Sequence, residues 1–120
     1  MAENVTILYR IVAHNPPTRE DVLSYQELGI ALTRRDPEAL RLAAGISLYN
    51  TFQQARNQAR RLPPAQRGFI AELRIPFDAP VTIERSTSTR GHYTLWGSPD
   101  VILGYVARVV PHDTTSTGGV

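Results

Sequence analysis

The sequence predicts a single α+β domain built on a mostly antiparallel sheet of five to six strands, with three to four short helices. Apolar residues alternate in several short segments and recur at helical spacing in others. The late strand-like segments follow one another with little or no helix between them, which favours antiparallel pairing. The expected order is β-α-α-β-α-β-β-β-(α)-β over residues 1–112, with 113–120 as a disordered polar tail.

The length of 120 residues fits one domain with its own buried core. The absence of cysteine excludes thiol nucleophiles and thiolate metal sites. All 13 basic residues are arginine, and the net charge of +2 permits an anionic ligand without demanding one. Glu3 and Arg10 do not fit an export signal, and no apolar run reaches the roughly 20 residues that span a bilayer. We therefore expect a cytoplasmic protein without a membrane partner.

The first half of the chain contains two strand patterns and three helix patterns. Val5–Ala13 alternates with apolar residues on both faces, which predicts a central strand. Thr18 and Asp21 resemble a capping box for a short helix that reaches Leu28 and ends at Gly29. A second helix follows the cap at Asp36, a strand covers 46–49, and a third helix covers 51–62.

The second half predicts a hairpin between strands 69–75 and 81–86, across the turn Phe77–Pro80. In the expected register Glu72 lies opposite Glu84, where the two carboxylates could share a proton or be relieved by Arg74. An exposed face or a slipped register is the alternative interpretation. A short strand at 92–96, one helical turn at 98–103 and a last strand at 105–110 complete the pattern.

Arg10 is the first candidate for a functional residue, because it interrupts a strand that is otherwise apolar on both faces. A buried guanidinium needs anionic or carbonyl partners. Those partners could be a ligand phosphate or carboxylate. Alternatively, Arg10 forms an ion pair with Glu72 or Glu84, or reaches water from an edge strand.

The junction 45–51 is the second candidate. Its strand places Ser47 and Tyr49 on one face, next to a helix N-terminus that favours an anion. The alternative is a half-buried Tyr49 whose hydroxyl contacts a backbone carbonyl.

Two further segments are rich in arginine. One consists of the outer side of the helix 51–62 and the residues just after it. It could bind the phosphates of a nucleic acid or be a solvated surface, and it contains Gln53, Arg56, Asn57, Arg60, Arg61 and Arg67. The other, 85–97, either holds phosphate oxygens and stacks on a base, or is a turn whose aromatic residues seal the core; it contains Arg85, Arg90, His92, Tyr93 and Trp96. The spacing of the three histidines predicts no metal site.

Leu8–Val12, the two short helices after it, and Gly45–Thr51 with its following helix resemble ADP-ribosyltransferase-like domains, including small RES-type toxins. The resemblance covers residues 5–60 in pattern and the remainder only in strand count. It implies that Arg10 holds NAD and that Ser47 or Tyr49 packs on the nicotinamide ribose. The family's late Glu has no counterpart after Glu84. Either Glu84 or Asp100 has this role, or the domain is a catalytically reduced relative. Ser86–Ser88 spells the Ser-Thr-Ser of one branch, but falls after the fourth strand and is not a match.

The resemblance thus implies a domain that binds NAD or a related nucleotide as a substrate, without a bound cofactor, and that consumes NAD as a toxin would. The implied catalytic residues are Arg10, Tyr49 and Glu84. The expected ligand-binding residues are Ser47, Arg85, Arg90, His92 and Trp96. The alternatives are a non-catalytic interaction or regulatory module, such as the partner or immunity protein of a toxin system, using the Arg56, Arg60 and Arg67 surface or segment 93–96, and a weak nucleic-acid binder.

Overall fold

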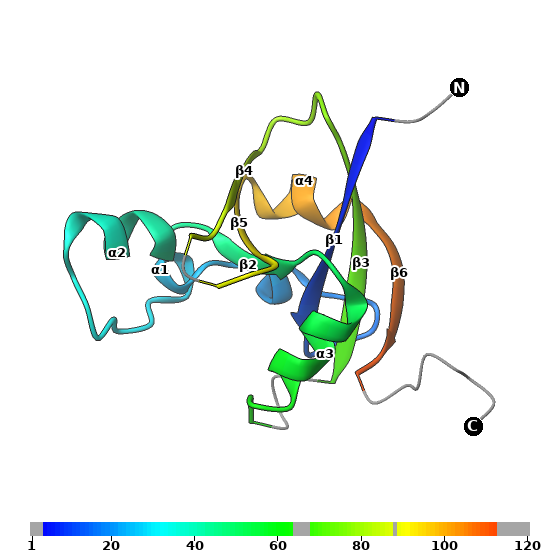
Figure 1. The fold of residues 1–120 in the computed structure, drawn as a ribbon, viewed down its shortest axis with the longest axis horizontal. Coiled ribbons are helices and arrows are strands. Elements are labelled where there is room, and N and C mark those ends of the chain that lie inside the picture. The colour runs from blue at the N-terminus through cyan, green and yellow to red at the C-terminus, as the bar shows by residue number, and fades with distance from the viewer. Residues whose placement is uncertain (1–3, 64–67, 88, 113–120) are drawn as a thin grey trace.

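The computed structural model describes residues 4–63, 68–87 and 89–112, and its strands form one antiparallel sheet in the order β4-β5-β2-β1-β3-β6 (Figure 1). The strands are β1 (Val5–Val12), β2 (Ile46–Tyr49), β3 (Phe69–Pro76), β4 (Thr82–Arg85), β5 (His92–Trp96) and β6 (Val106–Pro111). The helices are the 3₁₀ turn η1 (Arg19–Val22), α1 (Tyr25–Leu28), α2 (Pro37–Ala43), α3 (Phe52–Ala59) and α4 (Pro99–Leu103). The predicted fold class and element order are confirmed. The expected tail, 113–120, lies outside the described residues.

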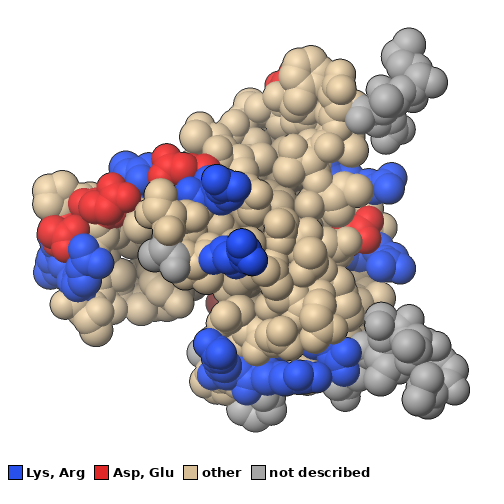
Figure 2. Space-filling view, in the orientation of Figure 1, with Lys and Arg blue, Asp and Glu red and all other residues tan. Residues whose placement is uncertain are grey.

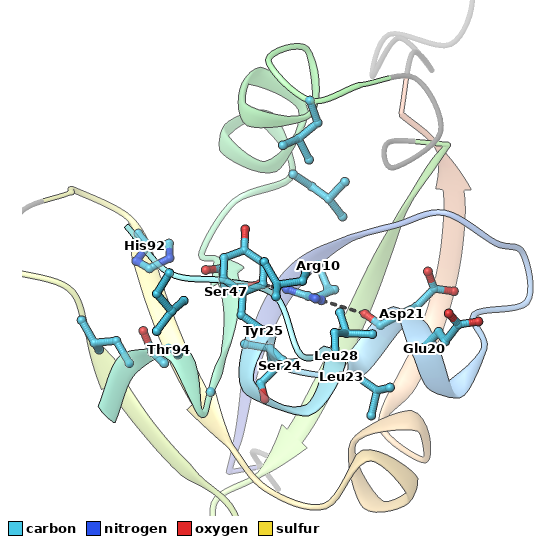
Figure 3. Close-up of a pocket in the computed structure, with 18 of the residues that line it drawn as sticks. Arg10, Glu20, Asp21, Leu23, Ser24, Tyr25, Leu28, Ser47, His92 and Thr94 are labelled. Atoms are coloured by element: carbon cyan, nitrogen blue, oxygen red, sulfur yellow. Dashed lines mark hydrogen bonds between the residues drawn. The ribbon is translucent and has the colours of Figure 1, made fainter. Parts of the chain in front are cut away.

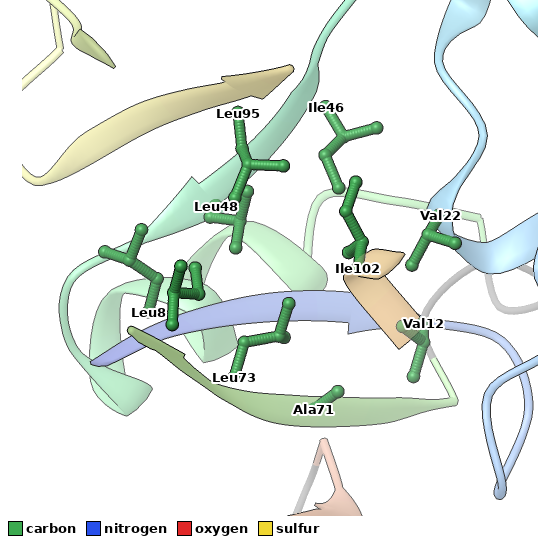
Figure 4. Packing of buried hydrophobic residues seen from close by; sticks show 10 residues of the cluster. Leu8, Val12, Val22, Ile46, Leu48, Ala71, Leu73, Leu95 and Ile102 are labelled. Carbon is green, nitrogen blue, oxygen red and sulfur yellow. The ribbon is translucent and has the colours of Figure 1, made fainter. Parts of the chain in front are cut away.

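Strand β1 is central, as its two apolar faces predict. On one face, Leu8 and Val12 belong to the main core, together with residues of β2, β3 and β5 and of η1 and α4. Figure 4 shows these side chains directed toward one another beside α4. On the other face, Tyr9 packs edge-on against Phe52 of α3, with ring centroids 6.3 Å apart. The main core therefore covers one face of β1, and α3 covers the other.

Helix α3 begins where the sequence predicts. The Thr51 side chain accepts a hydrogen bond from the Gln54 amide at 3.1 Å, which satisfies one of the free donors of the first turn. Ala55 and Ala59 are fully buried against the sheet. Their small side chains, four positions apart, let the helix approach β1, β2 and β3 closely.

The predicted hairpin between β3 and β4 is wrong. Strand β3 lies between β1 and β6, whereas β4 pairs only with β5. Alternation within a strand indicates which residues share a face but not which strand lies beside it. Glu72 therefore stands opposite Tyr9 and Arg108, and Glu84 stands opposite Thr94. The two carboxylates are not neighbours and cannot share a proton.

Residues 25–43, from α1 to α2, form an extension that we call the arm, at the far left of Figure 1. The single helix predicted up to Leu28 is instead η1 and α1, because Ser24 and Glu27 form a new capping box. Gly29 ends α1 with a φ of 72°, as predicted. None of the described helices is both long enough and apolar enough to cross a membrane.

The arm is attached to the sheet through Arg41 of α2. The Trp96 indole N–H donates to the Arg41 carbonyl at 2.9 Å, and the Arg41 guanidinium lies 5.1 Å from the centroid of the Trp96 ring. The same guanidinium donates to both carboxylate oxygens of Glu84, at 2.8 and 3.1 Å. These contacts connect α2 to β4 and β5.

Candidate functional site

The sheet opens between β1 and β2. Among the described residues, Tyr9 opposite Tyr49 is the register pair of these strands, and the ladder does not continue toward Val12. The Arg10 side chain bridges this opening: its Nη1 donates to the Ser47 carbonyl at 2.9 Å, and its Nε donates to the Asp21 carbonyl at 3.0 Å. Arg10 thus joins β1 to β2 and to η1 where backbone pairing has stopped.

Two of the alternatives for Arg10, the edge strand and the ion pair, are wrong. Arg10 is on an interior strand, and in the described part of the chain it forms no ion pair, with Glu72, Glu84 or any other carboxylate. Burial lowers the pKa of its guanidinium, while Tyr49, Tyr25 and Asp21 act in the opposite direction. A carbonyl carries only a partial charge, so the positive charge of Arg10 is solvated by dipoles and not neutralised.

A cavity of about 580 Å³, the open-edge cavity, lies over Arg10 (Figure 3). Its polar side contains Arg10, Ser47, Tyr49, His92 and Thr94, and its apolar side includes residues of the arm: Tyr25, Leu28, Ile30, Leu32 and Leu42. Strand alternation explains the polar side, because Ser47 and Tyr49 share a face with Thr94 and His92, which lie opposite them on β5. A charged group, hydroxyls and apolar walls therefore meet in one space.

Tyr49 and His92 form one wall of this cavity. Their rings contact each other edge-on, with centroids 5.4 Å apart and planes at 62°. Burial raises the pKa of the Tyr49 phenol, against the attraction of Arg10, and burial lowers the pKa of His92. Near neutral pH both rings are therefore uncharged, and each carries a hydrogen-bonding group beside the cavity.

Asp21 is a cavity residue that the sequence analysis treated only as a helix cap. Its carboxylate accepts from the backbone amides of Ala13 and Thr18, each at 2.8 Å, and lies 3.0 Å from Nδ1 of His14. Burial alone would raise its pKa, but these hydrogen bonds outweigh burial and the pKa is lowered. Its neighbour Glu20 also lines the cavity and is exposed. Asp21 is therefore committed to the local fold, whereas Glu20 is available to a ligand.

The sequence analysis did not predict the apolar wall that the arm contributes to the open-edge cavity. Tyr25, Leu28 and Ile30 remain 59%, 42% and 47% exposed. In a sequence, such residues resemble the buried side of a short helix, and no pattern indicates that the arm extends from the sheet. The long interval between two predicted strands, 14–45, was the signal available.

The remaining predicted residues lie outside this cavity. Arg85 and Arg90 line a second depression, described below, and Trp96 and Glu84 hold Arg41. Asp100 is exposed, and its Oδ1 lies 3.6 Å from Nε of Arg19. The segment 93–96 is part of β5, paired on both sides by β2 and β4, so it is not a free loop.

On α3, Gln53 and Asn57 are exposed and hydrogen-bonded to each other at 2.9 Å. Arg56 lies within α3, and Arg60 and Arg61 lie at its C-terminal end. Figure 2 shows basic side chains without acidic neighbours along the lower edge of the molecule. Arg67 lies outside the described residues.

Within the described ranges, no group of three or more Asp, Glu or His side chains is placed to hold a metal ion. Comparisons of the chain with protein-family models, with curated proteins and with solved structures find no match.

Proposed function

We propose that this protein binds NAD or a related nucleotide in the open-edge cavity. The observation that carries the proposal is the convergence of Arg10, Ser47, Tyr49 and His92, which come from three strands, on one space. Its volume of about 580 Å³ falls within the range of roughly 300–1,000 Å³ that is usual for small-molecule sites.

Each part of the cavity matches one part of a nucleotide. Arg10 keeps its charge without a carboxylate partner, so a phosphate would complete its neutralisation. The Ser47 hydroxyl is exposed and suits a ribose hydroxyl. The arm supplies an apolar surface on which an aromatic base can pack, beside the rings of Tyr49 and His92.

The binding test is calorimetric titration of the protein with NAD and ADP-ribose. Arg10→Gln should weaken NAD binding by at least about tenfold, the loss expected for one charge-assisted contact. Tyr49→Phe, which keeps the ring, should weaken it less. Arg74→Gln is the matched control, since it removes one arginine from the neighbouring strand β3 without touching the cavity. Equal affinities of the wild type and Arg10→Gln, or no binding by the wild type, would refute the proposal.

The catalytic form of this function is hydrolysis or transfer at the nicotinamide–ribose bond of NAD. A carboxylate near that bond would stabilise the positive charge that develops on the ribose. The resemblance implies Glu84, which is held by Arg41, whereas Glu20 lines the cavity. NAD loss should therefore disappear in Glu20→Gln and persist in Glu84→Gln. The reverse pattern would return the role to Glu84.

A non-catalytic interaction module is the second candidate, because the arm exposes large apolar side chains. Leu40 is 43% exposed and, unlike Leu28 or Ile30, does not line the cavity. Exposed apolar clusters of this kind are typical of protein-binding surfaces. Absence of any nucleotide binding would favour this function over the first.

A further inference from the structure

A second depression, of about 850 Å³, lies at the opposite side of β5 from the open-edge cavity. It is lined by Asn50, Arg85, Ser86, Thr87, Arg90, Gly91 and Tyr93. His92 and Thr94 line the first cavity and Tyr93 lines the second, and successive residues of a strand point to opposite faces. The two depressions are therefore separate sites. We call the second one the Arg85–Arg90 site.

The charge of this site distinguishes it from most of the arginine surface. Elsewhere, Arg34 pairs with Asp36, Arg41 with Glu38 and Glu84, and Arg74 and Arg108 with Glu72. Arg85 and Arg90 have no carboxylate partner within the described residues, and no carboxylate is among the residues that line the site. Two guanidinium groups therefore face one depression with their charge uncompensated.

The backbone around the site is held by hydrogen bonds. Asn50 donates its amide to the Gly91 carbonyl at 2.9 Å, and Ser86 donates its amide to the His92 carbonyl at 2.8 Å. Gly91 has a φ of 78°, and a Cβ there would overlap the amide group of Gln54. The end of the loop is thus seated directly on α3, and a side chain at 91 would separate them.

We propose that the Arg85–Arg90 site binds the phosphate group of a phosphate monoester. The net charge of two arginines matches the phosphate dianion, and planar guanidinium groups bind phosphate oxygens in pairs. The Thr87 hydroxyl and the side-chain amide of Asn50 add hydrogen-bonding groups to the lining of the site. The Tyr93 ring forms a flat wall for the group that carries the phosphate. This site is independent of the nucleotide proposed for the open-edge cavity.

The test is an NMR titration of the ¹⁵N-labelled protein with inorganic phosphate, and then with glycerol phosphate and phenyl phosphate, at constant ionic strength. We expect saturable shifts at the amides of Asn50, Thr87 and Gly91, with half-saturation on the order of millimolar for phosphate alone. Phenyl phosphate should bind several-fold more tightly than glycerol phosphate, because Tyr93 lines the site beside the ester group. Sodium acetate is the monoanion control and should give weaker shifts.

The variants are Arg85→Gln, Arg90→Gln and the double replacement, with Arg74→Gln as the matched control on another strand. Each single variant should weaken phosphate binding several-fold, and the double variant should abolish it, while Arg74→Gln binds as the wild type does. NAD titration of the double variant should be unchanged, because Arg85 and Arg90 lie outside the open-edge cavity. Equal shifts at every exposed arginine, or saturation that survives the double variant, would overturn the proposal.

Discussion

The two edges of β1 differ. Toward β3, all eight residues of β1 are in register with a partner, from Val5 opposite Pro76 to Val12 opposite Phe69. Toward β2, Tyr9 is paired with Tyr49, and beyond this pair the Arg10 side chain, not the backbone, connects the two strands. The same strand is thus closed on one edge and open on the other. We infer that the closed edge carries most of the stability and that the open edge provides space for a ligand.

The open edge of β1 is energetically unfavourable, and Arg10 reduces this effect. An open strand edge leaves backbone carbonyls without partners, which is unfavourable in a partly buried place. Arg10 satisfies one of them, the Ser47 carbonyl of β2, and also donates to the Asp21 carbonyl of η1. A single residue therefore both stabilises the opening and places a positive charge inside it.

The largest expected effect is at the closed edge. Leu73 of β3 is fully buried and lies opposite Leu8, so Leu73→Ala leaves a cavity in the core. It should lower the free energy of unfolding by about 2–5 kcal/mol, measured by urea denaturation. Leu40→Ala on the arm is the control, since Leu40 is 43% exposed and should lose far less. Similar losses in both variants would contradict a core concentrated at the closed edge.

Arg10→Gln tests the open edge and should have the next largest effect on stability. Removing the guanidinium leaves the Ser47 and Asp21 carbonyls without their donor, and should lower the free energy of unfolding by about 1–3 kcal/mol. Hydrogen exchange should also speed up more in β2 than in β3. Unchanged exchange in β2 would show that Arg10 does not hold the opening together.

The pH dependence of the free energy of unfolding tests the role of Asp21, whose carbonyl accepts a hydrogen bond from Arg10. Its hydrogen bonds keep its pKa below the value of about 3.9 expected in the unfolded chain. The folded state therefore binds fewer protons there, so this stabilisation is full above about pH 4 and is lost as the pH falls through the lowered pKa. Asp21→Asn should be less stable at pH 7, with a shallower loss in acid, as followed by thermal unfolding. A slope identical to that of the wild type would exclude Asp21 as a source of the acid sensitivity.

The comparison also separates what the sequence reveals from what it does not. Alternation identified β1 as central, and the caps at Asp36 and Gly29 marked helix ends, because each signal is local. The placement of β3 between β1 and β6 depends on contacts between segments that are distant in the chain, and no local pattern encodes it. The wrong hairpin arose from this difference.

The open edge was only half predictable. An arginine in an apolar strand indicates an unusual environment, and Arg10 does have one. Its partners are backbone carbonyls, which every residue carries, so no residue type in the sequence could identify Ser47 or Asp21 as the acceptors. The division of the expected ligand residues between two sites likewise depends on strand alternation at His92 and Tyr93, once the neighbours of β5 are known.

The smallest expected effect on stability is that of Glu84→Gln, which acts on neither edge of β1. Glu84 and Arg41 are both exposed, and water screens exposed ion pairs strongly. The Trp96 indole still donates to the Arg41 carbonyl in this variant, so α2 should stay attached to β5. We expect the thermal midpoint to change by little more than the error of measurement, and NAD affinity to match that of the wild type. A large loss of affinity would mean that the position of the arm, and not only the opening beside β1, determines the shape of the cavity.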